Sequence, residues 1–165
     1  MTDINVDDFF KDAARALVAL YGVFPRRHAL FVDDIYGPEE PDEFGLHSDR
    51  YQACFGTLLW LGEENYLRFE ETIRNEAVDQ AILTGRAFTL LSSPVDALPP
   101  DESSGTDPGN GNDAIELPEL VRIEHATHIH HIKLALKNRS SIELRRSMLG
   151  LMSRMERVVG TPAQP

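Results

Sequence analysis

Cysteine is almost absent from the sequence: Cys54 is the only one among 165 residues. A single thiol cannot form a disulfide within the chain or supply a cysteine-ligated zinc site. We therefore interpret Cys54 as a small buried apolar residue. Apolar residues also never run for the roughly 18 positions that a membrane-spanning helix requires. The opening, MTDINVDDFFKDAARAL, has acids where a signal peptide would have bases. These absences predict a cytoplasmic protein that does not enter a membrane.

Basic residues are scarce in the first part of the chain. Residues 1–97 have 18 acidic and 8 basic side chains, residues 98–117 have 5 and none, and residues 118–165 have 4 and 8. The local net charges are therefore −10, −5 and +4, within a total of −11. Because a nucleic-acid backbone is repelled by the first part and attracted by the last, this asymmetry disfavours DNA as a partner of residues 1–97.

Residues 98–117 have the composition of a flexible linker. The segment LPPDESSGTDPGNGNDAIEL contains three Pro and three Gly. Between Leu98 and Ile115 its only apolar side chains are those of the prolines and Ala114. Such a segment has little surface to bury on folding. It divides the chain into an N-terminal domain, residues 1–97, and a C-terminal segment, residues 118–160.

Hydrophobic periodicity predicts an ordered series of elements in the N-terminal domain. A helical period of apolar residues ends near Gly22, and Ser48 stands as an N-cap before a second such run. The expected order is a helix up to about residue 22, a strand at 28–31, a helical turn at 33–36, a helix at 49–61, strands at 65–69 and 78–83 joined by a polar turn, and a helix at 85–92 that Thr84 caps. An acidic loop, residues 38–46, precedes the helix at 49–61.

This order, and two motifs within it, resemble a winged-helix domain over about residues 5–95. The motifs are LLWLGEENYLRFE, where a helix ends and an aromatic strand begins, and VDQAILTGRAFTLL, where the second strand leads into a closing helix. The resemblance implies a mainly α fold with a small β-hairpin (α+β). It also implies that the helix at 49–61 and the hairpin, or wing, face DNA in DNA-binding members. The acidic loop departs from the usual short turn, and a docking surface there would be long and negative.

Four residues would carry DNA recognition under this resemblance. Arg50 and Gln52, on the predicted outer face of the helix at 49–61 with Asp49, Ala53, Gly56 and Thr57, would contact base edges. Arg68 and Arg74 in the wing would contact the backbone or the minor groove. The competing interpretation is an ordinary solvated or protein-contacting face, because Glu63, Glu64 and other acids surround these positions.

The C-terminal segment predicts two amphipathic helices. Pro118 suits the first position of one, which Asn138 ends, and SSIE at 140–143 is typical of a capping box that starts the second at 141–159. A strand at HIHHIKLAL is the alternative. The four histidines His125, His128, His130 and His131 favour packing at a helical interface; metal binding or pH sensing is less favoured because the order lacks a metal motif.

Two such helices cannot bury their apolar stripes alone, so they must pack on the first domain, on a second copy or on a partner. The stripe predicted to form this oligomer or partner interface is Val121, His128, Ile132, Leu136, Leu144, Met148, Met152 and Met155. No catalytic constellation and no cofactor motif is apparent. The sequence thus predicts a non-enzymatic, acidic winged-helix interaction and assembly module that becomes oligomeric through its C-terminal helices. The alternative is a DNA-binding transcriptional regulator that these helices dimerise.

Overall fold

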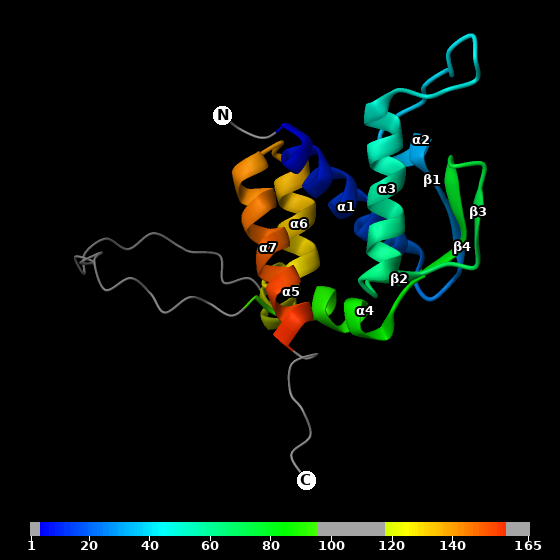
Figure 1. Cartoon of the computed structure of the whole chain (residues 1–165). Coiled ribbons are helices and arrows are strands. Elements are labelled where there is room, and N and C mark those ends of the chain that lie inside the picture. Colours follow the sequence, from blue (N-terminus) through cyan, green and yellow to red (C-terminus); the bar gives the residue numbers. More distant parts are fainter. Residues whose placement is uncertain (1–3, 96–117, 158–165) are drawn as a thin grey trace.

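A computed structural model describes residues 4–95 and 118–157 of the chain. These residues form a mainly α structure with a small antiparallel sheet, as the sequence predicts (Figure 1). The predicted linker, 98–117, and the last two positions of the predicted helix at 141–159 lie outside the described residues. Among residues 4–95 and 118–157, no helix combines the length and the hydrophobicity that crossing a membrane requires.

The first helix, α1 (Ile4–Val23), is the centre of the molecule. Phe10, Ala13, Leu17 and Leu20 recur on one face at the helical period and are buried. On one side, this helix contacts α3 (Asp49–Glu63) and strand β4 (Ala77–Leu83). On the other side, it contacts the C-terminal helices α6 (His128–Lys137) and α7 (Ser141–Arg157) (Figure 1). The N-terminal elements and the C-terminal helices consequently share one hydrophobic core.

Helix α3 begins as predicted and ends later than predicted. The Ser48 hydroxyl accepts a hydrogen bond from the backbone N–H of Tyr51 at 3.2 Å, which caps the first turn. The helix continues through Gly62 to Glu63, and the left-handed residue that reverses the chain is Asn65, with φ of 62°. Gly62 serves close packing instead, since a Cβ there would lie 2.7 Å from Cε1 of Phe69.

The sheet is built around β4. Strand β1 (His28–Phe31) lies antiparallel along one edge of β4, and β2 (Leu67–Arg68) and β3 (Glu71–Ile73) pair with successive parts of β4. The predicted polar turn is therefore shorter than expected, because Glu71–Ile73 are paired. The reversal is made by Arg74 and Asn75, whose φ values of 47° and 59° match a two-residue hairpin turn.

Two further helices complete the N-terminal elements. The short α2 (Val32–Ile35) follows β1 directly and buries Val32 and Ile35. Helix α4 (Gly85–Ser92) begins where predicted, because the Thr84 hydroxyl accepts from the backbone N–H of Ala87 at 3.1 Å. The helices plus small antiparallel sheet of residues 4–95 are compatible with the winged-helix resemblance.

The described C-terminal segment is mainly helical, and HIHHIKLAL lies within one of its helices, which excludes the strand alternative. It has three helices, α5 (Glu119–His125), α6 (His128–Lys137) and α7 (Ser141–Arg157), where two were predicted. The break falls at Thr127, whose hydroxyl accepts from the backbone N–H of His130 at 3.3 Å and so starts a new helix. Helices α6 and α7 pack on each other and on α1 and α4.

The residues just before the segment 96–117 are bonded to the junction between α5 and α6. Pro94 and Thr127 form an antiparallel bridge. The Val95 N–H donates to the Ala126 carbonyl at 2.7 Å, and the His128 N–H donates to the Ser93 carbonyl at 3.0 Å. The C-terminal helices are therefore tied by backbone hydrogen bonds, as well as by apolar packing, to the end of α4.

Candidate functional site

Arg50 faces α1, not solvent. Its Nη1 and Nη2 atoms donate to Oδ2 and Oδ1 of Asp12 at 2.6 and 2.8 Å, and its Nε lies 3.1 Å from Oδ2 of Asp8. Its guanidinium also lies 4.9 Å from the centre of the Tyr36 ring. The hydrogen bonds that Arg50 donates to Asp12, together with the negative charges of Asp12 and Asp8, raise the pKa of Arg50. The expectation of an exposed Arg50 is therefore wrong, because two carboxylates on α1 bind it.

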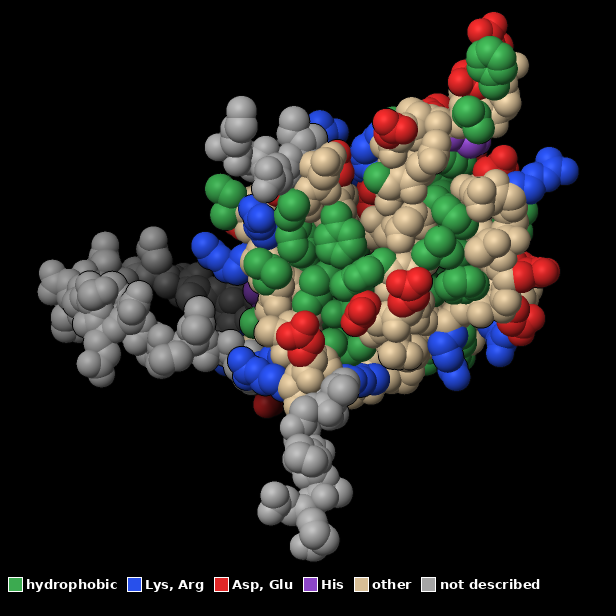
Figure 2. Space-filling model, in the orientation of Figure 1, with side chains coloured by type: hydrophobic (Ala, Val, Ile, Leu, Met, Phe, Trp, Pro, Cys, Tyr) green, Lys and Arg blue, Asp and Glu red, His purple; other side chains and the backbone are tan. Residues whose placement is uncertain are grey.

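A groove runs between α1 and α3 on this face. It encloses about 860 Å³ and is lined by Phe9, Ala53, Gly56 and Trp60, with Asp8 and Asp49 near Arg50. Trp60 meets Phe9 edge to face at 5.1 Å and stacks on Tyr66. Figure 2 shows hydrophobic side chains between α7 and α3. Thr57, expected on the exposed face, is buried. This face of α3 is therefore mainly apolar, with acidic residues beside Arg50 at one end.

The other three predicted DNA-contact residues, Gln52, Arg68 and Arg74, lie away from Arg50 and in two different hollows. Gln52 is exposed, and its Nε2 donates to the His47 carbonyl at 2.9 Å. Gln52 and Arg74 share the lining of a hollow of about 320 Å³ between α3 and the β3–β4 turn. Arg68 is exposed on β2 and lines a different hollow, beside Phe69. The structure thus brings Gln52 and Arg74 together but separates both from Arg50 and Arg68.

The acidic loop carries the most exposed aromatic side chain of the described residues. Phe44 is 79% exposed and Leu46 is 61% exposed. The loop projects from the body of the molecule near α2 and α3, with hydrophobic side chains flanked by acidic ones at its end (Figures 1 and 2). Glu40, Asp42 and Glu43 belong to the same loop. An apolar tip within an acidic surround is therefore held away from the core.

The tip of the acidic loop is ordered by its own hydrogen bonds. Oδ1 of Asp42 accepts from the backbone N–H groups of Phe44 and Leu46 at 2.9 and 2.8 Å. The Asp42 N–H donates to the Leu46 carbonyl, and Gly45 turns the chain with φ of 77°. The side chain of Phe44 is thus presented on a closed turn, where little further backbone ordering is needed for binding.

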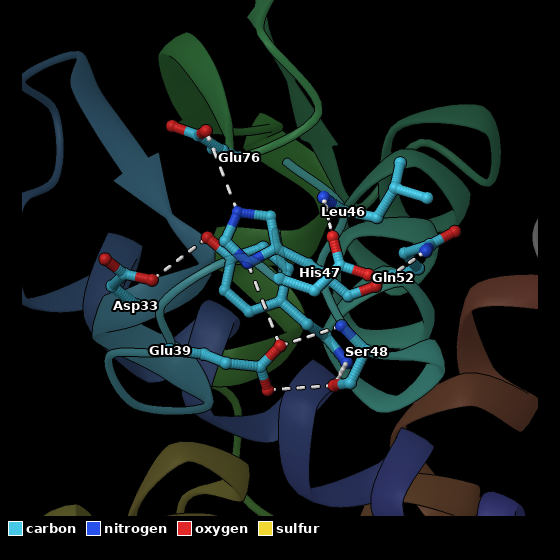
Figure 3. Close-up of polar contacts among 9 residues, drawn as sticks. Asp33, Glu39, Leu46, His47, Ser48, Gln52 and Glu76 are labelled. Atoms are coloured by element: carbon cyan, nitrogen blue, oxygen red, sulfur yellow. Dashed lines mark hydrogen bonds and ion pairs between the residues drawn. The ribbon is translucent and has the colours of Figure 1, made fainter. Parts of the chain in front are cut away.

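The base of the loop is fastened to α3 and to the sheet (Figure 3). The Glu39 carboxylate accepts from both the N–H and the hydroxyl of Ser48 at 2.8 Å, and these two bonds chiefly lower the pKa of Glu39. His47 stacks on Tyr51 at 3.9 Å and lies 3.8 Å from carboxylate oxygens of both Glu39 and Glu76. A protonated His47 would therefore bridge the loop to the sheet.

The predicted interface of the C-terminal helices is largely internal. His128, Ile132, Leu144, Met148 and Met155 are buried, and all but His128 belong to the shared hydrophobic core. The remaining three, Val121, Leu136 and Met152, are half-buried. These helices contact α1 and α4 of their own chain. The five buried side chains therefore have no surface left for a second chain, and self-association stays a prediction that needs another surface.

The four histidines of the C-terminal segment do not form one cluster. His128 is buried, His130 is half-buried, and His125 and His131 are exposed. The rings of His125 and His130 stack with their centres 4.4 Å apart. Across residues 4–95 and 118–157, no group of three or more His, Cys, Asp or Glu side chains is arranged to hold a metal ion.

Two residues important to this surface were missed in the sequence. The sequence pattern places Asp12 in a helix. No neighbouring residue in the sequence indicates that its side chain binds Arg50, which is 38 positions away. Phe44 lies in the segment PEEPDEFG, which its prolines and acids identify only as a loop. An aromatic residue within such a polar segment is the one signal that distinguishes the tip.

The chain matches no protein-family model, no curated protein and no solved structure. The winged-helix resemblance therefore rests on the order of the elements and the two motifs that carry it. Function has to be inferred from the contacts, exposure and charge of the described residues.

Proposed function

We propose that residues 4–95 are a winged-helix domain, buttressed by the C-terminal helices, and that the chain is a non-enzymatic, cytoplasmic protein-interaction module. The docking element is the acidic loop, with Phe44 as its anchor. The observation that carries this proposal is an aromatic side chain, 79% exposed, on a turn closed by hydrogen bonds that the Asp42 carboxylate accepts. Rigid, exposed aromatic anchors are typical of protein interfaces.

The charge on α3 supports a protein partner over DNA. Arg50 is the only basic residue of α3, and it is bound by Asp8 and Asp12. The groove beside it has an apolar lining, whereas DNA affinity depends largely on basic side chains that neutralise phosphates. Residues 1–97 also have a net charge of −10. A duplex approaching this face would meet carboxylates and apolar side chains.

A non-enzymatic role is supported by the state of the one thiol. Cys54 is fully buried, and burial, followed by the charge of Asp12, raises its pKa to about 12. A thiol that is neither accessible nor ionised is a poor nucleophile. A single buried cysteine also fits the reducing cytoplasm.

Photo-crosslinking tests the proposed docking element directly. A photoreactive phenylalanine analogue is placed at position 44 of the full chain, expressed in its native host, and irradiated. We expect discrete protein adducts. The matched control carries the analogue at Leu120, which is 77% exposed on α5, and should give few or none. Equal adducts at both positions, or none at position 44, would overturn the proposal.

A DNA-binding transcriptional regulator is the second candidate. One observation favours it: Arg74 is exposed at the tip of the β3–β4 turn, where a wing would enter a minor groove. A gel shift with mixed-sequence duplex DNA at low salt decides between the two. The interaction module predicts no binding below about 100 μM, the weak end of non-specific affinity. Tight, salt-dependent binding that Arg74→Ala weakens would establish the regulator instead.

A further inference from the structure

A small pocket with a basic rim lies where α1 meets the α6–α7 corner. It encloses about 260 Å³. Its apolar lining is Ala135, Leu136 and Leu144, and its basic residues are Lys11, Arg15 and Arg139. No carboxylate contributes to the lining. Arg15 is held in place by donating to the Ile35 carbonyl at 3.0 Å. We call this site the basic pocket.

The basic pocket is an exception on an acidic molecule. The chain has a net charge of −11, yet three bases surround this one hollow. Within residues 4–95 and 118–157, none of the three forms an ion pair with a carboxylate. A ligand that brings negative charge beside an apolar group suits this site, because the lining is apolar and the rim is cationic.

The acidic loop has the complementary chemistry. Phe44 supplies the apolar group, and Glu40 and Glu43 beside it form no ion pair within the described residues. The size also fits: a cavity of about 150 Å³ admits benzene, and the basic pocket is larger. The acidic loop and the α6–α7 corner both lie toward the upper end of the molecule in the view of Figure 1.

We infer that the chain binds a second copy of itself, with Phe44 of one copy inserted into the basic pocket of the other. This inference rests on the proposed function, in which Phe44 is the docking anchor, and adds the partner. In this contact, Glu40 and Glu43 of one copy lie against Lys11, Arg15 and Arg139 at the rim of the basic pocket of the other copy. The contact joins two different surfaces of the molecule. It is therefore either made twice between two copies, which gives a two-fold dimer, or repeated from each copy to the next, which gives an open assembly.

The association is weak and depends on ionic strength. One aromatic anchor and a few rim charges make a contact at the small end of protein interfaces. The overall charge of −11 makes two copies repel at long range, while the rim charges attract at contact. Local complementarity therefore decides whether and where two copies meet, and removing either half of the contact removes the association.

Sedimentation of the full chain from about 10 μM to 1 mM at about 50 mM salt tests the inference. We expect the average mass to rise with concentration. Phe44→Ala should weaken self-association about 10-fold or more, because burying a phenylalanine contributes at least that factor. Arg139→Glu should weaken it comparably. Leu120→Ala, which removes an equally exposed apolar side chain on α5, should leave it unchanged. Circular dichroism confirms that each variant is folded.

A charge-swap pair gives the sharpest outcome. Glu40→Lys with Glu43→Lys changes the net charge from −11 to −7, which weakens general repulsion, yet it should abolish self-association. The control, Glu63→Lys with Glu64→Lys, makes the same charge change at the end of α3 and should preserve it. Mixing the loop variant with Lys11→Glu/Arg139→Glu, which cannot self-associate either, should restore a mixed complex.

Failure of this inference is distinguishable from failure of the proposed function. A chain that stays monomeric over the whole range, or self-association unchanged by Phe44→Ala and Arg139→Glu, overturns the second-copy assignment. If position 44 then still crosslinks to another protein, the interaction module stands with a foreign partner. If position 44 gives adducts with neither a second copy nor another protein, both are overturned.

Discussion

Arg50 and Asp12 form a two-pronged ion pair that locks α3 to α1. The two guanidinium nitrogens lie 2.6 and 2.8 Å from the two carboxylate oxygens, and the Asp12 side chain is only 1% exposed. Arg50 keeps 26% exposure at the edge of the groove. A buried carboxylate without this partner would be strongly destabilising. Arg50, which the alternative DNA-binding interpretation of the sequence assigns to base contact, is therefore bound to α1 within the helix pair.

Replacing Arg50 should cost stability. Removing one partner of a buried pair leaves an uncompensated charge, which for this partly exposed guanidinium corresponds to about 2 kcal/mol or more. Arg50→Gln should lower the free energy of unfolding by that amount in urea denaturation. Arg68→Gln, at the exposed position of β2, should change it by no more than about 0.5 kcal/mol.

A double-variant cycle checks that the loss comes from the pair itself. Asp12→Asn combined with Arg50→Gln should destabilise by clearly less than the sum of the two single changes, because each single change already removes the interaction. Additive losses would show that the two side chains act independently and would contradict this account.

Local signals explain what the sequence predicts well. Ser48 and Thr84 cap α3 and α4 as expected, because an N-cap hydrogen bond spans only three residues. Strand β1 also has the predicted bounds, because its short apolar run is followed directly by a turn of helix. The break at Thr127 also has a local cause, but the helical period of the apolar residues continues across it and hides the cap.

Contacts between distant segments explain what the sequence does not predict. Periodicity places Arg50 and Thr57 on the outer face of α3, and only the position of α1 shows that the groove occupies that face. Most of the predicted stripe on the C-terminal helices is buried in the chain's own core, and its use as an interface with another chain stays a prediction. Its partner could not be deduced, because an apolar helix face packs equally well on its own chain or on another. The basic pocket likewise combines residues of α1 with residues 120 or more positions later.

Gly62 should resist substitution although it lies within a helix. A Cβ at this position would be 2.7 Å from the Phe69 ring, so Gly62→Ala forces the ring or the helix to move. Such overpacking typically costs about 1–3 kcal/mol, which offsets the gain of about 1 kcal/mol from replacing a helical glycine. We expect a net loss of unfolding free energy in urea.

Gly150 in α7 is the matched control for Gly62. A Cβ there meets nothing within 4 Å, so Gly150→Ala should raise the free energy of unfolding by about 0.5–1 kcal/mol. If both substitutions stabilised the protein equally, close packing between Gly62 and Phe69 would not be the reason for glycine at this corner.

Cys54 should react with thiol reagents only when the protein unfolds. Its side chain has no exposed surface, and its pKa of about 12 leaves almost no thiolate at pH 8. Labelling at pH 8 should be about 1,000-fold or more slower than in the denatured chain, in line with the stability of ordinary domains. Rapid labelling without denaturant would show that α3 separates from α1 in the native state.

Stability should decrease as the pH falls below about 6.5 because of His130. Burial, then the neighbouring His125, His131 and Lys133, lowers the pKa of His130 below its ordinary value of 6.5. The unfolded chain therefore binds this proton first as the pH falls, and the free energy of unfolding decreases as the pH falls below about 6.5. His130→Gln should flatten this decrease in urea titrations at successive pH values. His28→Gln, which removes an exposed histidine of β1, should retain the wild-type slope, and an unchanged slope in His130→Gln would assign the pH dependence to other groups.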